Sequence, residues 1–118
     1  MERSIYTLIR GADWREAERA GAYHGSEHDR RDGFLHFSTA AQVRASAAKH
    51  RRGEADLWLI EADAERLGDA LKWEPAAGGS RPGLFPHLYA SLPLASILSV
   101  TRLPLNADGT HDFPAGTP

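Results

Sequence analysis

Two histidines stand in similar apolar surroundings, and they are the first candidates for chemistry in this chain. His36 lies within the run Phe-Leu-His-Phe-Ser, and His87 lies within the run Phe-Pro-His-Leu-Tyr. Because strand side chains alternate, Ser38 would share a face with His36, and Tyr89 would share a face with His87. A buried imidazole needs hydrogen-bond partners. The pattern predicts either two structural histidines or one polar cleft lined by all four side chains, and we favour the cleft.

Glu74 is the candidate carboxylate. It ends a predicted strand and precedes a segment rich in Gly and Pro at residues 75–83. Loops that follow rigid strands often carry functional groups. A carboxylate in such a place can act as a base or stabilise a cationic transition state. The alternative interpretation is a surface glutamate beside a turn.

Metal binding is not expected from the sequence. His24 and His28 are four residues apart, but residues 23–31 read as a polar loop, where that spacing does not define one helical face. No His-Glu-x-x-His motif occurs. The chain has no Cys, which excludes a thiolate zinc site, an iron–sulfur cluster, a disulfide scaffold and a Cys nucleophile. We therefore predict a site without a metal.

The elements that must position these residues are those of an α+β domain. Helices are predicted over residues 14–20, after an Asp13 cap, and from a Thr39 cap to about residue 52. Pro86 would place its strand at a sheet edge or at a kink. Helices early and strands late favour α+β over alternating α/β. β-Branched and aromatic residues predict strands at residues 4–10, 34–38, 57–62, 70–74, 84–90 and 97–103.

The composition is that of an ordinary globular domain. The chain has 118 residues and a formal net charge of −2, which gives no general attraction to nucleic acid or to anionic membranes. We expect one domain at residues 1–104 and a flexible tail at residues 105–118, where apolar periodicity is missing. No targeting or membrane-spanning segment is evident, so a cytoplasmic location is the default expectation.

Several motifs together resemble a known family. They are similar to motifs of a bacterial family, domain-of-unknown-function family nine-fifty-two, and the resemblance covers residues 4–104. The fold of that family is similar to that of ADP-ribosyltransferases. This implies a single compact domain with split antiparallel β-sheets, two main helices and a cleft that holds NAD in active relatives. The motifs are Asp-Gly-Phe-Leu-His-Phe-Ser-Thr at 32–39, Leu-Lys-Trp-Glu-Pro at 71–75 and Leu-Phe-Pro-His-Leu-Tyr at 84–89, with Ile-Tyr-Thr-Leu at 5–8 and Trp14.

The resemblance also implies roles for individual residues. Glu74 would orient a ribose hydroxyl or stabilise positive charge, as a catalytic residue beside His36 and His87. Thr7 stands at the first-strand position where many members of the family have His, and Thr cannot supply a cation. The residues implied to bind the ligand are Tyr6, Thr7, Phe34, Ser38 and Tyr89.

The leading hypothesis is a domain that binds NAD or a related nucleotide and transfers or hydrolyses at the nicotinamide–ribose bond, with NAD as substrate. The alternative is a non-enzymatic domain, for small-molecule binding or protein interaction, that has kept the fold and lost the catalysis; the replaced histidine at Thr7 favours it. An RNA-end-processing phosphotransferase ranks third. Such enzymes bind phosphates through arginines in the cleft, whereas the arginines at positions 30, 31, 51 and 52 are expected at helix ends and in loops, and the net charge is negative. We expect a small-molecule or nucleotide partner, with no membrane and no nucleic acid; the oligomeric state is left open.

Overall fold

Three antiparallel sheets hold the strands of the residues that the computed structural model describes, 3–76 and 82–114. The main sheet has the order β1-β4-β8, and a second sheet, called here the site sheet, has the order β3-β6-β5. A two-stranded sheet pairs β2 with β7. The strands are β1 (Ser4–Arg10), β2 (Ala22–Tyr23), β3 (Leu35–His36), β4 (Leu57–Asp63), β5 (Leu71–Pro75), β6 (Leu84–Leu88), β7 (Leu92–Pro93) and β8 (Ile97–Leu103).

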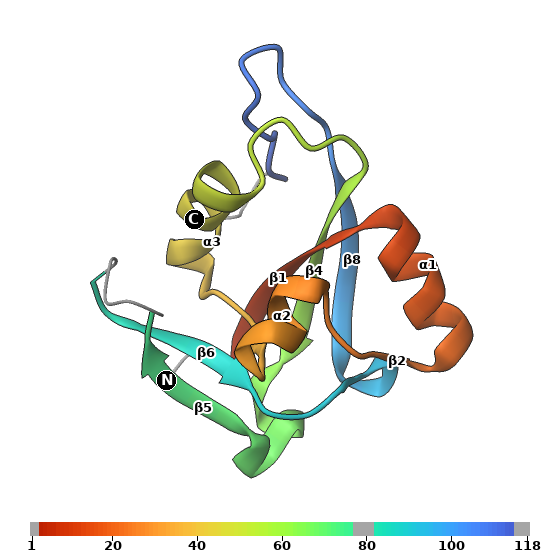
Figure 1. Ribbon diagram of the computed structural model, residues 1–118, viewed down its shortest axis with the longest axis vertical. Helices are drawn as coiled ribbons and strands as arrows, with labels where there is room; N and C mark the ends of the chain where they lie inside the picture. The colour runs from red at the N-terminus through yellow and green to blue at the C-terminus, as the bar shows by residue number, and fades with distance from the viewer. Residues whose placement is uncertain (1–2, 77–81, 115–118) are drawn as a thin grey trace.

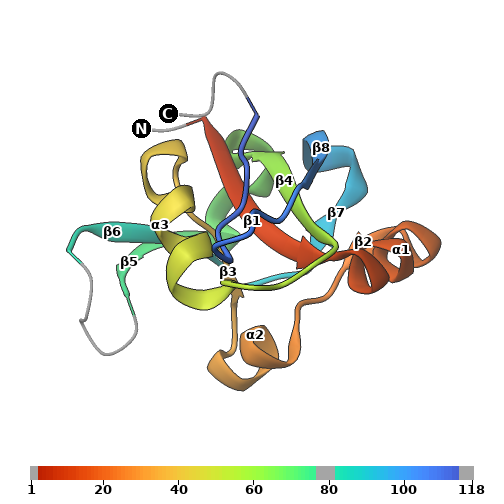
Figure 2. The ribbon, with the colours of Figure 1, turned by 90° about the horizontal axis from the view of Figure 1, so that it is seen from above.

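Helices flank the main sheet on two sides and complete a single compact α+β domain. Figure 1 shows α1 on one side of β1, β4 and β8, and α3 on the other side, where the β5–β6 hairpin also lies. Figure 2 shows the same arrangement from above, with α2 set apart from both. The helical segments are α1 (Gly11–Ala20), α2 (Glu27–Asp32), α3 (Ala40–His50) and the 3₁₀ helices η1 (Ala64–Ala70) and η3 (Leu94–Ser96).

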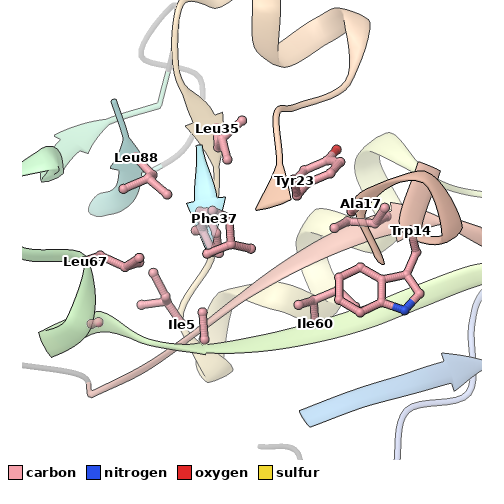
Figure 3. Close-up of a cluster of buried hydrophobic side chains, with 13 residues drawn as sticks. Ile5, Trp14, Ala17, Tyr23, Leu35, Phe37, Ile60, Leu67 and Leu88 are labelled. Atoms are coloured by element: carbon pink, nitrogen blue, oxygen red, sulfur yellow. The ribbon is translucent and has the colours of Figure 1, made fainter. Parts of the chain in front are cut away.

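The larger part of the core lies between the main sheet and the site sheet. Ile5 and Ile60 of the main sheet are fully buried. They pack in one cluster with Leu88 of the site sheet and with Phe37, which follows β3 (Figure 3). Burying one such side chain contributes about 1.5–3 kcal/mol. A smaller cluster, in which Val43 is fully buried, packs α3 against the main sheet. The apolar faces predicted for the long strands therefore hold the two sheets and α3 together.

A short pairing joins the main sheet to the site sheet. The N–H of Tyr6 donates to the Ser38 carbonyl at 2.8 Å, and the N–H of Ser38 donates to the Tyr6 carbonyl at 2.7 Å. The hydroxyl of Thr7 donates to the His36 carbonyl at 2.9 Å. The first strand thus meets the His36 segment directly.

The sequence predictions hold for the long elements. Strands were predicted at residues 4–10 and 97–103, and β1 and β8 occupy these ranges. The predicted Thr39 cap is present at the start of α3, where Thr39 and Gln42 form a capping box. Helix α1 begins at Gly11 rather than after Asp13, with Arg10 as its N-cap, and the Gly11 N–H donates to the Asp56 carbonyl at 2.8 Å.

The prediction of a loop at residues 23–31 was wrong, because α2 occupies much of it. The Asp29 N–H donates to Ser26 Oγ, and the Ser26 N–H donates to the Asp29 carboxylate, which together form a capping box. Gly33 ends the helix in the left-handed region, at φ 89°. The chain therefore has three α-helices among its described residues, not two.

Pro86 was predicted to mark a sheet edge or a kink, and the edge position was wrong. β6 is the central strand of the site sheet. The Pro86 carbonyl accepts from the Phe37 N–H at 3.0 Å, and the nitrogen of a strand residue faces the same side as its carbonyl. The backbone N–H that Pro86 lacks would therefore point just beyond the end of β3, where the β3–β6 pairing does not require a donor.

The segment after β8, for which flexibility was predicted, folds back in its first part. Leu105 pairs with His111 in an isolated bridge. The His111 ring is buried, with Nε2 2.7 Å from the Glu54 carbonyl. Most of the predicted loop at 75–83 and the last residues of the tail lie outside the described residues. Among the described residues, no helix has the length and apolar character that crossing a membrane would demand.

Candidate functional site

A cleft of about 410 Å³ opens between β1, α3 and the site sheet, with α2 at its mouth. Such a volume falls within the range of small-molecule sites. The described residues that line it come from all of these elements: Tyr6, Thr7, Leu8, His28, Asp32, His36, Phe37, Ser38, Ser46, Lys49, His50, Arg51, Ala76, Phe85 and His87.

The register of the site sheet brings the two predicted histidines together. His36 of β3 stands directly opposite His87 of β6, and their ring centroids lie 5.9 Å apart. On the other side of β6, Glu74 stands opposite Phe85, so it shares the face of His87 two positions along. The core face of the same sheet carries Leu35 and Leu88. One sheet therefore has an apolar face and a face with the candidate polar groups.

His36 is held between two carboxylates of α2. Its Nδ1 lies 2.5 Å from Asp29 Oδ1, and its Nε2 lies 2.8 Å from Asp32 Oδ2. Burial opposes the charged form of the ring, but the hydrogen bonds and charges of both carboxylates outweigh burial and raise the pKa of His36 above its ordinary value of 6.5. Both ring nitrogens face carboxylate oxygens, so this arrangement favours the protonated form of the ring.

Asp29 is the buried anchor of this arrangement. Its carboxylate also accepts from the Ser26 N–H at 2.8 Å and from the His36 N–H at 3.1 Å. The Tyr23 hydroxyl lies 3.4 Å from the same carboxylate. Burial would raise the pKa of Asp29, but the hydrogen bonds from His36 and Ser26 lower it. The carboxylate is therefore ionised and fixes both the helix start and the His36 ring.

His87 has different surroundings. It is buried, its Nδ1 lies 2.9 Å from Glu74 Oε1, and its ring stacks on Phe34 with centroids 4.0 Å apart. The Tyr89 hydroxyl donates to the same Glu74 oxygen at 2.7 Å. The hydrogen bonds from Tyr89 and His87 lower the pKa of Glu74, and Glu74 in turn raises the pKa of Tyr89. Glu74 is an ionised carboxylate joined to the cleft through His87.

The floor of the cleft is polar, but its groups are bonded within the protein. Thr7 donates its hydroxyl to the His36 carbonyl, and Ser38 Oγ lies 2.8 Å from Ser46 Oγ. Tyr6 contributes its ring to the wall and its backbone to the pairing with Ser38. These residues shape the cleft as much as they offer contacts to a ligand.

The structure thus separates the predicted site residues into two groups. His36, His87, Tyr6, Thr7 and Ser38 line the cleft. Glu74, Phe34 and Tyr89 are not among the lining residues in the described part of the chain. Glu74 and Phe34 contact the His87 ring on its own face of the site sheet, and Tyr89 contacts Glu74 and Phe34.

Sequence reasoning missed the residues that α2 contributes. Asp29 and Asp32 bond His36, and the His28 ring lies 4.5 Å from the His36 ring. The spacing of Ser26 and Asp29 was the signal for a helix start, but an Asp in the third helical position is a weaker signal than Glu or Gln. His28, Asp32 and His36 each offer a ligand atom, and these atoms lie within 4.8 Å of one another.

Comparisons with known proteins agree with the family resemblance. A crystal structure of protein CC0527 from Caulobacter crescentus is 40% identical, covers 92% of this chain and 93% of its own, and has a TM-score of 0.85. The solution NMR structure of the same protein, also 40% identical, covers 92% and 91% with a TM-score of 0.80. No curated protein matches the chain. The family described as "Protein of unknown function (DUF952)" matches residues 8–100. That match spans most of the chain, and the fold of the chain agrees with the CC0527 structures. This protein therefore belongs to family nine-fifty-two.

Proposed function

We propose that this protein binds an anionic nucleotide of the NAD class in the cleft. The observation that carries the proposal is the pairing of His36 and His87 across β3 and β6, in a cleft of about 410 Å³ with a cationic rim. Imidazole N–H groups donate hydrogen bonds to ribose and phosphate oxygens. This role falls to His87, because both ring nitrogens of His36 are already bonded to Asp29 and Asp32. The resemblance to ADP-ribosyltransferase-like domains supports the same class of ligand.

The charge of the lining favours a phosphate-bearing ligand. Lys49 and Arg51 come from the end of α3, and the carboxylates beside His36 raise its pKa and so favour its charged form. Arg51 is bonded to the Leu8 carbonyl at 3.1 Å and pairs with Glu54 at 3.2 Å, so its guanidinium is held in place and its charge is partly neutralised. Asp32 is the one carboxylate among the described lining residues, and His36 partly neutralises it. Charge-assisted bonds to phosphate are among the stronger hydrogen bonds in proteins.

The apolar part of the lining suits a planar ring. Tyr6 and Phe85 are aromatic residues of the lining, and Phe85 shares the face of the site sheet that carries His87. Aromatic rings stack on flat heterocycles in offset or edge arrangements. A nicotinamide or adenine ring would pack against these walls, while its ribose and phosphate face the histidines.

A reaction at the nicotinamide–ribose bond would use Glu74 through His87. The C1′–N bond breaks, its electron pair leaves with neutral nicotinamide, and positive charge develops on the ribosyl carbon. Water or an acceptor hydroxyl then adds to that carbon and releases a proton. His87 lines the cleft and contacts Glu74 at 2.9 Å, so the carboxylate would stabilise positive charge carried by or near that ring.

A second candidate function, ligand binding without catalysis, has its own support. Glu74 does not line the cleft, and the Thr7 hydroxyl is bonded to the His36 carbonyl. Neither side chain offers a free polar group to a ribose in this arrangement. The domain would then recognise a nucleotide without breaking it.

Calorimetric titration with NAD⁺ and with ADP-ribose tests the proposal, in buffer that contains a chelator. We expect one ligand per chain. Lys49→Gln should weaken binding about three- to tenfold, because the residue lies at the cleft rim. Arg19→Gln is the control, since Arg19 is exposed on α1, pairs with Glu16 and lies outside the lining. Absence of binding for both ligands would overturn the proposal.

Nicotinamide release distinguishes the two candidates. The catalytic proposal expects slow release from NAD⁺ that Glu74→Gln abolishes while ADP-ribose binding persists. Binding without release favours the non-enzymatic candidate.

A further inference from the structure

We propose that His28, Asp32 and His36 bind one divalent transition-metal ion of the zinc class at the mouth of the cleft. The expectation of a site without a metal rested on a loop at residues 23–31. Because α2 forms there instead, His28 and Asp32 lie four residues apart on one helical face, and His36 of β3 stands beside them.

The spacing of the three donor atoms suits a single ion. Asp32 Oδ2 lies 3.6 Å from His28 Nε2 and 2.8 Å from His36 Nε2. Tetrahedral ligands bound to zinc at 2.0–2.1 Å lie about 3.3 Å from one another. The two observed separations bracket that value, so small side-chain rotations would bring all three atoms into coordination.

The surroundings of His36 provide a second, independent observation. Histidines that bind metals commonly donate the other ring N–H to a carboxylate, which fixes the ring and its tautomer. Asp29 Oδ1 lies 2.5 Å from His36 Nδ1, and Asp29 is itself buried and held by the Ser26 N–H. This leaves Nε2 of His36 directed toward Asp32 and the cleft. The ion would take the place of the Nε2 proton, which is released to solvent on binding.

The donor set selects the class of metal. Two imidazoles and one carboxylate suit zinc, iron, cobalt or nickel, whereas magnesium and calcium prefer oxygen ligands throughout. Three protein ligands leave a coordination position open. Because His28, Asp32 and His36 all line the cleft, that position would face a water or a phosphate oxygen of a bound ligand.

The positive charge of Arg31 opposes metal binding at this site. The Arg31 guanidinium contacts His28 Nδ1, and it lies 3.8 Å from Asp32 Oδ1. Coordination through Nε2 requires a proton on Nδ1, so Arg31 must turn away. Its side chain is 70% exposed, so it can reach water. Removing this cation should therefore tighten metal binding.

The test is calorimetric titration of the chelator-stripped full chain with Zn²⁺, with Co²⁺ absorption as a report on the coordination geometry. We expect one ion per chain, at least tenfold weaker binding for His28→Gln, and about threefold tighter binding for Arg31→Gln. The His28 side chain is 52% exposed, so its replacement leaves the fold intact. His24→Gln is the matched control, because exposed His24 contacts Ser91 outside the cluster.

Two results would overturn the metal site: no saturable Zn²⁺ binding by the native chain, or equal affinity in His28→Gln and His24→Gln. Neither depends on nucleotide binding, which is measured in the presence of a chelator. A failed metal site and a failed nucleotide site are thus told apart.

Discussion

His36 and His87 face each other across two strands, yet the protein holds them by different means. His36 is half-buried, with carboxylates at both ring nitrogens. His87 is buried, with one carboxylate contact and a ring stacked on Phe34. Charge fixes the first ring, whereas packing fixes the second to a larger extent.

The difference also concerns distance along the chain. Asp29 and Asp32 are seven and four residues from His36, so one short helix supplies both partners. Glu74 is 13 residues from His87 and reaches it through the β5–β6 pairing. The charged side of the site therefore depends on α2, and the packed side depends on the site sheet.

The largest expected contrast between the two sides comes from their carboxylates. Asp29→Ala removes the buried acceptor of the His36 ring and of the Ser26 N–H, and we expect a loss of about 3 kcal/mol in the free energy of unfolding. Glu74→Ala should lose much less, because its side chain is 38% exposed and water replaces it. Urea denaturation of both variants measures the contrast, and equal losses would contradict it.

The pH dependence of stability should identify the charged side. His36 has a raised pKa in the folded state, so its contribution is complete below about pH 6.5 and is lost as the pH rises through the folded value. The pKa of Asp29 and of Asp32 is lowered, so their contribution is present above about pH 4 and is lost as the pH falls below it. Stability should peak between these limits.

The measurement is the urea midpoint from pH 3 to pH 9. His36→Gln should flatten the alkaline limb, while His24→Gln, remote from both carboxylates, should retain it. An alkaline limb that persists unchanged in His36→Gln would assign the effect to another group.

Phe34 connects the two sides, and its removal should disturb both. Its ring centroid lies 4.6 Å from that of His36 and 4.0 Å from that of His87. Because Phe34 is half-buried, Phe34→Ala should cost about 1–2 kcal/mol of stability. NMR signals of both histidine rings should shift in this variant. A shift of one ring alone would mean that the two sides are independent.

The smallest expected effect is confined to the packed side. Glu74→Gln removes the charge that raises the pKa of Tyr89, so Tyr89 should ionise at a lower pH in the variant. NMR titration of the tyrosine ring carbons measures this change. Glu16→Gln serves as the control, because Glu16 pairs with Arg19 on α1. An unchanged Tyr89 titration would show that the 2.7 Å contact does not persist in solution.

The sequence predicted the parts of the fold that bury apolar surface. β1 and β4 were recognisable because their β-branched and aromatic residues reflect burial in the sheet. Helix α2 was not, because Asp29 is its one buried residue and it has no apolar stripe. The position of Pro86 at the centre of a sheet depended on where β3 ends, which is a tertiary property.

The site divides in the same way. Alternation along strands placed His36 and Ser38 on one side, and both line the cleft. The contact of Glu74 with His87 follows from the β5–β6 register, which the motifs alone did not specify. Asp29 and Asp32 were missed as partners of His36, because their role begins only when α2 turns them toward β3.

The two hydrogen bonds between Tyr6 and Ser38 make a seam between the sheets, directly under the cleft. A ligand that separates the two sheets must lengthen these hydrogen bonds. The exchange rates of the Tyr6 and Ser38 amide protons with deuterium should therefore report on changes in the width of the cleft. Amides of β4, which is paired on both sides, should exchange only when the whole domain unfolds. Ligand binding in the cleft should therefore change the exchange rates of the Tyr6 and Ser38 amides while those of β4 stay the same.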